Sequence, residues 1–370
     1  MSRPRAASRP VALSVALSAA LSALAVIVAA CGGSASPTPS PSPSPASSAS
    51  VAPASPSAAP LDGSLTVYSG RTETLVGPVI ERFEAASGVD VQVKYGDTAE
   101  LAATILEEGS ASPADVYIAQ DAGALGAVAS EGILAGLPSN VLDRVDARFR
   151  SPAGTWVGVS GRARVAAYDA RAIADGALPA SITGFTDPAW KGRLGWAPTN
   201  GSFQAFVTAL RVLDGEDAAR AWLEGIVANE PKVYEGNNPV VAAIAAGEIE
   251  VGFVNHYYAL QQAAEQGPRF PVENHFFAGG DPGALVNVAG AGILTTSANP
   301  ATALAFLEFL LNDETQAYFA HETFEYPLVP AIEIDDRLVP LAELEPPDID
   351  LSDLADLQGT LRLLSEVGIL

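Results

Sequence analysis

Residues 64–119 read SLTVYSGRTETLVGPVIERFEAASGVDVQVKYGDTAELAATILEEGSASPADVYIA, and they decide the fold. The run from 64 to 68 predicts a strand, and the apolar residues after it recur at helical spacing until Gly88. A period-two strand ends at Tyr95, a second helical pattern follows, and residues 115–119 predict a third strand. This β-α-β-α-β order predicts a parallel sheet covered by helices.

Ligands bind such sheets beyond the carboxyl ends of the strands. In this chain those ends are residues 69–73, 95–98 and 120–121. A second, similar strand-helix unit spans residues 193–254, and the later segments can return to the first unit. We therefore expect an α/β protein with two lobes and a cleft between them.

The first sixty residues differ from the rest in composition. Residues 1–30 place three arginines ahead of an apolar run and are typical of an export signal, with an uncleaved transmembrane helix as the alternative. The ending Val28-Ala29-Ala30-Cys31 resembles a bacterial lipobox, which implies cleavage before Cys31 and lipidation of that cysteine. Residues 31–63 are then an anchored, extended tether rich in Ser, Pro and Ala, and the remainder lies outside the cytoplasm.

Charge and cysteine content exclude several classes of function. The formal net charge is -23, so nucleic acid is not an expected partner. The acidity is compatible with cation binding, although solubility of an exported protein also accounts for it. Cys31 is the only cysteine, which excludes a disulfide and a cysteine-based metal site.

Tyr257 and Tyr258 directly follow the apolar run Val251 to Val254. Phenolate oxygen is a hard ligand, and a strongly polarising cation can displace the phenol proton at neutral pH. Two adjacent phenolates favour a trivalent hard metal, ferric iron above all. The alternative is that the pair simply packs in the core or at its rim.

Six motifs, in this order, make the chain resemble the ferric-iron substrate-binding proteins of bacterial ATP-binding-cassette importers. They begin at Val67, Ser112, Val159, Pro198, Asn255 and Asp281 and read VYSGR, SPADV, VSGRAR, PTNGSF, NHYY and DPGAL. The resemblance covers about residue 65 to the C-terminus. It implies a periplasmic-binding-protein-like fold with two lobes, residues 64–163 plus 288–338 and residues 164–287 plus 339–370. A hinge of crossing strands near 162–164 and 286–288 would join them.

The resemblance also implies roles for second-lobe residues. Tyr257 and Tyr258 match paired tyrosinate ligands of the metal. A loop at a helix start would bind an auxiliary anion such as phosphate or carbonate, for which backbone N–H groups are suited. The residues that match this anion site are Asn200, Gly201, Ser202, Asn237 and Asn255. His256 shows no metal-ligand spacing with the other histidines, and we expect a structural or supporting role for it.

The first lobe departs from the family pattern. Thr72 stands where many relatives have a histidine ligand, and Gln120 stands where they have a glutamate. Each has a carboxylate beside it, and we expect Glu73 or Asp121 to reach the metal directly or through water, or both to solvate the rim of the cleft. We expect Arg71 to pair with the auxiliary anion or with Glu73, a surface charge being the alternative.

The sequence therefore predicts a lipid-anchored, extracytoplasmic, monomeric protein that captures Fe³⁺ with a small anion and delivers it to a permease with a cytoplasmic ATPase. Two phenolates, a carboxylate and a multivalent anion would neutralise a trivalent ion. The alternative ligand for the same fold is an organic or inorganic anion, such as a phosphonate, or a ferric chelate. Motifs of hydrolases are absent from the sequence, so we do not expect an enzyme.

Overall fold

The computed structural model describes residues 61, 63–174 and 176–370. The predicted signal peptide, Cys31 and most of the predicted tether lie outside the described residues. Within the part that is described, no helix combines the length and apolarity that a membrane crossing requires.

Helices and strands alternate along the chain as the sequence predicts. The α-helices of the described part are α1 (Glu73–Ser87), α2 (Thr98–Glu108), α3 (Ala122–Ser130), α4 (Ser139–Leu142), α5 (Gly201–Asp214), α6 (Glu216–Ala228), α7 (Asn237–Ala245), α8 (Tyr257–Gln266), α9 (Pro300–Leu310), α10 (Asp313–His321) and α11 (Leu357–Glu366). The strands there are β1 (Ser64–Ser69), β2 (Asp90–Tyr95), β3 (Val116–Ala119), β4 (Val157–Asp169), β5 (Leu194–Trp196), β6 (Lys232–Val233), β7 (Val251–Asn255), β8 (Val272–His275), β9 (Val286–Ile293) and β10 (Tyr326–Pro327).

Side chains and glycines set the ends of the helices that border the cleft. Helix α1 stops at Gly88, whose φ of 75° is a left-handed conformation that glycine adopts without a steric penalty. Helix α3 begins after Asp121, whose carboxylate accepts the N–H of Ala124. Helix α5 begins after Asn200, whose side-chain oxygen accepts the N–H of Ser202. These caps fix the first residues of α3 and α5.

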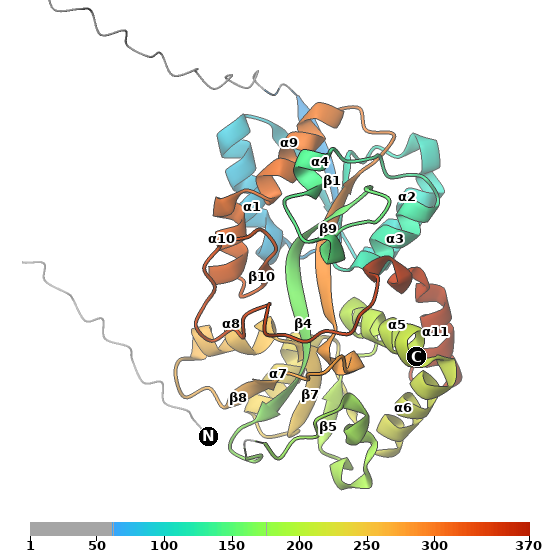
Figure 1. The fold of residues 1–370 in the computed structure, drawn as a ribbon, viewed down its shortest axis with the longest axis vertical. Helices are drawn as coiled ribbons and strands as arrows, with labels where there is room; N and C mark the ends of the chain where they lie inside the picture. The colour runs from blue at the N-terminus through green and yellow to red at the C-terminus, as the bar shows by residue number, and fades with distance from the viewer. Residues whose placement is uncertain (1–60, 62, 175) are drawn as a thin grey trace, which may run out of the picture. The chain divides into compact units, whose positions relative to one another are not determined.

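The strands form a sheet in the order β2-β1-β3-β9-β4-β7-β5-β6, with β8 and β10 also paired to β4. The predicted parallel β2-β1-β3 arrangement is confirmed, and β9 joins it in antiparallel orientation. The first part of β4 pairs with β9 and β10, whereas its last part pairs with β7 and β8. Figure 1 shows β4 and β9 running between an upper lobe with α1, α2 and α9 and a lower lobe with α5 to α8. The predicted α/β class with crossing strands is confirmed.

Each lobe has its own aromatic packing. In the upper lobe the ring of Phe83 from α1 meets those of Phe306 and Phe309 from α9 at centroid distances of 5.0 and 5.4 Å. In the lower lobe Trp222 contacts Phe206 and Phe253 at 5.2 and 5.7 Å. Ring contacts of this kind stabilise each lobe beyond the burial of apolar area alone.

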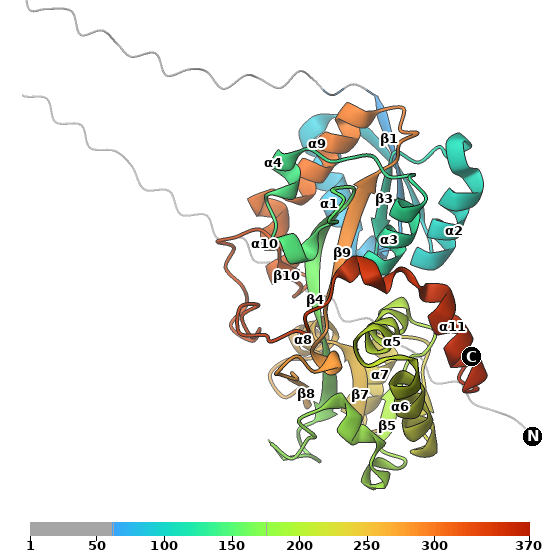
Figure 2. The ribbon, with the colours of Figure 1, turned by 45° about the vertical axis from the view of Figure 1, so that its right-hand side comes forward.

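The C-terminal tail spans both lobes, whereas the resemblance assigns residues 339–370 to the second lobe. A short 3-10 helix, η6 (Leu351–Ala355), packs on α3 of the upper lobe, and α11 packs on α5 of the lower lobe. Thr360 of α11 is hydrogen-bonded to Thr208 of α5 at 2.7 Å. Figures 1 and 2 show this red segment passing from α3 to α5. The apolar face of α11 explains its packing, but sequence periodicity carries no information about which lobe η6 contacts.

The contact between the tail and α3 predicts the effect of one glycine substitution. A Cβ added at Gly123 would lie 2.3 Å from the carbonyl oxygen of Leu354. We expect Gly123→Ala to lower the free energy of unfolding by about 1–3 kcal/mol, because overpacking outweighs the gain in helix propensity. Guanidinium unfolding followed by circular dichroism measures this.

The matched control is Gly136→Ala, because a Cβ there meets no atom within 4 Å. We expect this control to be neutral or slightly stabilising. Equal stability of the two variants would contradict the packing of η6 on α3.

Candidate functional site

The two adjacent tyrosines lie at the junction between strand β7 and helix α8. Strand β7 ends at Asn255, His256 makes the turn, and Tyr257 is the first residue of α8. The rings of Tyr257 and Tyr258 lie side by side, with centroids 4.2 Å apart and an angle of 30° between their planes. Tyr257 is buried and Tyr258 is half-buried. The pair therefore does not pack wholly into the core.

Both tyrosines face a cavity between the two lobes. The cavity encloses about 510 Å³ of space that is continuous with solvent. The upper lobe lines it with Arg71, Thr72, Thr74, Leu75 and Gln120, and the lower lobe lines it with Asn238, Tyr257, Tyr258 and Gln261. The structure thus brings the two phenols together with Arg71, Thr72 and Gln120 from the predicted site. A ligand in this cavity would contact both lobes.

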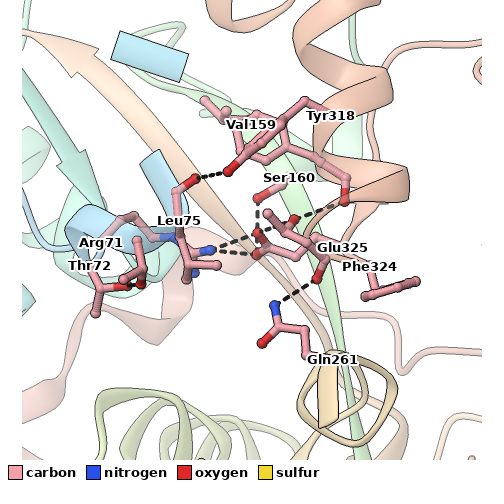
Figure 3. Close-up of polar contacts among 12 residues, drawn as sticks. Arg71, Thr72, Leu75, Val159, Ser160, Gln261, Tyr318, Phe324 and Glu325 are labelled. Atoms are coloured by element: carbon pink, nitrogen blue, oxygen red, sulfur yellow. Dashed lines mark hydrogen bonds and ion pairs between the residues drawn. The ribbon is translucent and has the colours of Figure 1, made fainter. Parts of the chain in front are cut away.

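Arg71 is buried and forms an ion pair with Glu325. One terminal nitrogen, Nη2, donates to both carboxylate oxygens of Glu325 at 2.8 and 2.7 Å (Figure 3). Glu325 also accepts hydrogen bonds from Ser160 and Thr323. The prediction that Arg71 pairs with Glu73 is therefore wrong, because its partner is Glu325. Sequence reasoning missed Glu325, although a lone acid inside the apolar run FEYPLV is a recognisable signal.

The charges around Tyr257 act on its pKa in opposite directions. Burial raises this pKa well above 10, and the neighbouring Tyr258 and Glu325 raise it further. The guanidinium groups of Arg71 and Arg162 lower it. Burial alone would lower the pKa of Arg71, but the charges of Glu325 and the two tyrosines raise it above its usual value. The Tyr257 hydroxyl is buried and has no hydrogen bond of standard geometry to any described residue, although its proximity contributes to the raised pKa of Arg71.

Two further buried arginines lie on the hinge strand β4. Arg162 is opposite Asn287 of β9, and none of its three guanidinium nitrogens has a hydrogen-bond partner among the described residues. Burial lowers the pKa of Arg162, and the nearby Arg71 lowers it too. Arg164 donates to the carbonyl oxygen of Phe253 at 2.7 Å and lies over the rings of Phe203 and Phe206. Sequence reasoning places both arginines near the hinge but assigns neither to the site.

His256 is fully buried between the two lobes. Its Nδ1 accepts the N–H of Ala163 in β4 at 3.2 Å, and its Nε2 is 2.8 Å from the carbonyl oxygen of Phe324. Burial lowers the pKa of His256 to about 4, so the ring is neutral at pH 7. These backbone contacts fit the structural or supporting role expected from the sequence.

Three of the residues expected at the anion site are hydrogen-bonded to one another near the start of α5, and none of the lower-lobe residues expected there lines the tyrosine cavity. The Asn200 side chain accepts hydrogen bonds from the N–H and the hydroxyl of Ser202 at 3.0 and 2.5 Å. Asn237, at the start of α7, donates to Asn200 and to Ser202 at 3.3 Å in each case. The Oδ1 atom of Asn237 is buried and has no partner among the described residues. Asn255 is buried at the end of β7, opposite Arg164.

The two carboxylates expected at the metal do not line the tyrosine cavity. Asp121 caps α3 and lies in a neighbouring cavity with Gln120 and Gly201, where burial raises its pKa. Glu73 is exposed at the start of α1. Thr72 and Gln120 do reach the tyrosine cavity, but each supplies a neutral oxygen. In this conformation the described residues of the upper lobe bring a cation, Arg71, and no anionic side chain to the cavity lining.

The sequence of this chain is similar to a family of known proteins. The family model described as bacterial extracellular solute-binding protein matches residues 111–352. An Fe(3+)-binding periplasmic protein of Serratia marcescens is 32% identical over 85% of this chain and 93% of the relative.

Solved structures agree with this assignment. Iron-bound HitA from Pseudomonas aeruginosa has a TM-score of 0.79 and 34% identity, covering 83% of this chain and all of that one. A Trichodesmium protein, FutA, solved with iron and citrate ligands has a TM-score of 0.72 and 28% identity, with 83% and 100% covered. This chain therefore belongs to the bacterial extracellular solute-binding proteins.

Proposed function

We propose that this protein captures ferric iron outside the cytoplasm and delivers it to an ATP-binding-cassette importer. The observation that carries the proposal is the pair of adjacent phenols that faces a cavity between two lobes. The Serratia relative is named for Fe(3+) binding, and the Pseudomonas structure is named as iron-bound. Because these are binding proteins, we propose a binding role and no catalytic one.

Ferric iron suits this cavity because both phenols can lose their protons to it. Burial opposes ionisation of Tyr257, but Arg71 and Arg162 favour the phenolate, and a trivalent cation favours it far more. The ion would bond to the Oη atoms of Tyr257 and Tyr258. A hard oxygen-rich site of this kind selects against soft metals. Hinge closure along β4 and β9 would then be stabilised by ligands from both lobes.

The remaining coordination positions need oxygen atoms from another source. Glu73 and Asp121 do not line the cavity, so we propose that an exogenous anion such as phosphate, carbonate or citrate completes the shell. Arg162 supports this proposal, because a buried guanidinium without hydrogen bonds needs an anionic or polar partner. Asn200, Gly201, Ser202, Asn237 and Asn255 would form a further part of the anion site on the lower lobe.

A ferric chelate is the second candidate ligand for the same cavity. The cavity opens to solvent between the lobes, and the Trichodesmium neighbour was solved with iron and citrate ligands. In this case the chelate would supply the anion and Arg71 and Arg162 would contact its carboxylates. An iron-free organic or inorganic anion, such as a phosphonate, would use the same arginines without the phenolates.

Cell location and partners follow from the proposed transport role. We propose that the chain is held on the outer face of the cytoplasmic membrane by lipid on Cys31. Residues 31–63 would act as a tether, and the protein would meet its permease as a monomer. The lipobox-like ending at Cys31 supports the anchor.

Loss of both phenols should abolish the coloured ferric complex. Tyrosinate-to-iron charge transfer gives visible absorption, which we expect when ferric citrate is added to the purified protein. For Tyr257→Phe/Tyr258→Phe we expect no visible band. We also expect an iron affinity that falls by more than the roughly 10- to 100-fold typical of losing a supporting residue.

Tyr95→Phe is the matched control, since Tyr95 is on edge strand β2 and 36% exposed. It should keep the band and the affinity. A colourless parent with tight binding of a phosphonate or iron-free citrate would instead favour the anion alternative.

Removing the carboxylate of Glu325 should destabilise the folded protein. Glu325→Gln leaves Arg71 as a buried charge without its counterion, which we expect to cost about 3–5 kcal/mol in the free energy of unfolding. The double variant Arg71→Met/Glu325→Gln should cost less than the single variant, because no unpaired charge remains. Chemical unfolding measures both.

The exposed Glu73→Gln is the control, with an expected change within about 0.5 kcal/mol. A Glu325→Gln variant as stable as this control would contradict the buried ion pair.

Replacing Cys31 tests the proposed anchor. In a bacterial host we expect the parent to incorporate radiolabelled fatty acid and to sediment with membranes. Cys31→Ser should lose the label. If an uncleaved helix anchors the chain instead, the parent will carry no label and the variant will sediment with membranes as well.

A further inference from the structure

One loop of the upper lobe contacts the helix that carries the tyrosines. Residues 322–325 connect α10 to β10, and the backbone carbonyls of Thr323 and Phe324 accept hydrogen bonds from α8 and the turn before it. His256 Nε2 is 2.8 Å from the Phe324 carbonyl oxygen, and Gln261 Nε2 is 3.0 Å from that of Thr323. The Tyr326 ring stacks on the imidazole at a centroid distance of 4.7 Å. Figure 3 shows Gln261 pointing to this loop beside Phe324 and Glu325.

The hydrogen bonds of His256 fix where its proton lies. The N–H of Ala163 can only donate, so Nδ1 must accept and the proton is on Nε2. The Nε2–H group then donates to the Phe324 carbonyl. Phe324 has a φ of 56°, an uncommon backbone conformation for a bulky residue, and it is buried. Such a conformation persists only where its surroundings hold it, and the hydrogen bond from His256 is one of these contacts.

A continuous series of contacts connects His256 to Arg71 and back to Tyr257. His256 precedes Tyr257, and Phe324 precedes Glu325. His256 is bonded to Phe324, Glu325 is paired with Arg71, and Arg71 lines the cavity together with Tyr257. The same two-residue segment, Phe324-Glu325, therefore helps to position both Tyr257 and Arg71. A shift of α8 relative to this segment would separate the phenol from the guanidinium.

We infer that His256 is a positioning residue for iron capture, which sets the Tyr257 phenol against Arg71 through its hydrogen bond to the Phe324 carbonyl. This inference rests on the proposed function. The bond to Ala163 connects His256 to the hinge strand, and the bond to Phe324 connects it to the upper lobe. The second bond carries the role, because it crosses from the tyrosine-bearing helix to the lobe that contributes Arg71.

Two amide substitutions at position 256 test the two hydrogen bonds one at a time. The amide oxygen of His256→Asn can accept from Ala163 but leaves Phe324 without a donor. The longer side chain of His256→Gln can donate to Phe324. We expect Asn to lower ferric-iron affinity about 10- to 100-fold, as loss of a ligand-supporting hydrogen bond does, and to shift the visible band. Gln should remain within about threefold of the parent.

Affinity is measured by competition with citrate, the band by visible absorption of the iron-loaded protein, and folding by guanidinium unfolding. His321→Asn, on the exposed end of α10, is the matched control and should change none of these. If His256→Asn does not fold, Gln261→Met supplies the test, because it removes the other bond from α8 to the loop. We expect it to weaken iron binding and shift the band.

This inference alone would be overturned if His256→Asn kept the iron affinity and the visible band of the parent, or if the Asn and Gln variants lost affinity equally. Where Gln261→Met is needed, an iron affinity and a band like those of the parent would overturn it as well. A parent chain that binds no ferric iron would overturn the proposed function as well.

Discussion

The site depends on positive charge buried next to two phenols. A buried guanidinium is costly unless an anion lies beside it, and the protein satisfies only one of the two near Tyr257. Arg71 is paired with Glu325, whereas Arg162 has no hydrogen-bond partner within the described chain. Arg162 therefore keeps guanidinium donors that a phenolate or an incoming anion could accept from, although the chain as a whole is acidic, with a formal charge of -23.

The hinge and the site share the same backbone. Strand β4 pairs with both halves of the sheet, carries Arg162 and Arg164, and donates the Ala163 N–H to His256. Lobe movement along this strand would thus change the surroundings of Tyr257. The C-terminal tail forms a second connection, with η6 on α3 and α11 on α5. Any relative movement of the lobes would therefore affect the tail as well as the contact between His256 and Phe324.

Sequence patterns predicted the elements well and the first-lobe site poorly. Period-two and helical spacing identified β1, α1, β2 and β3, whereas the family resemblance, and not the pattern, implied that the tyrosine pair faces the cleft. The apolar run around Glu325 indicates a buried acid, but its partner, Arg71, is 254 residues away, so local sequence could not predict the pairing. Asp121 was expected to reach the metal because it follows Gln120, which stands where relatives have a glutamate ligand, whereas in the structure its carboxylate caps α3. The bond from His256 to Phe324 was equally hidden, since it depends on how the lobes meet.

The iron-binding role proposed for this protein requires that ferric iron bonds to both phenol oxygens in the cavity between the lobes. Anomalous diffraction at the iron edge from crystals of the iron-loaded protein tests it most directly. We predict a single iron peak at bonding distance from the Oη atoms of both Tyr257 and Tyr258, with density for an oxygen-rich anion near Arg71 or Arg162. An iron peak bonded to neither phenol would contradict the claim.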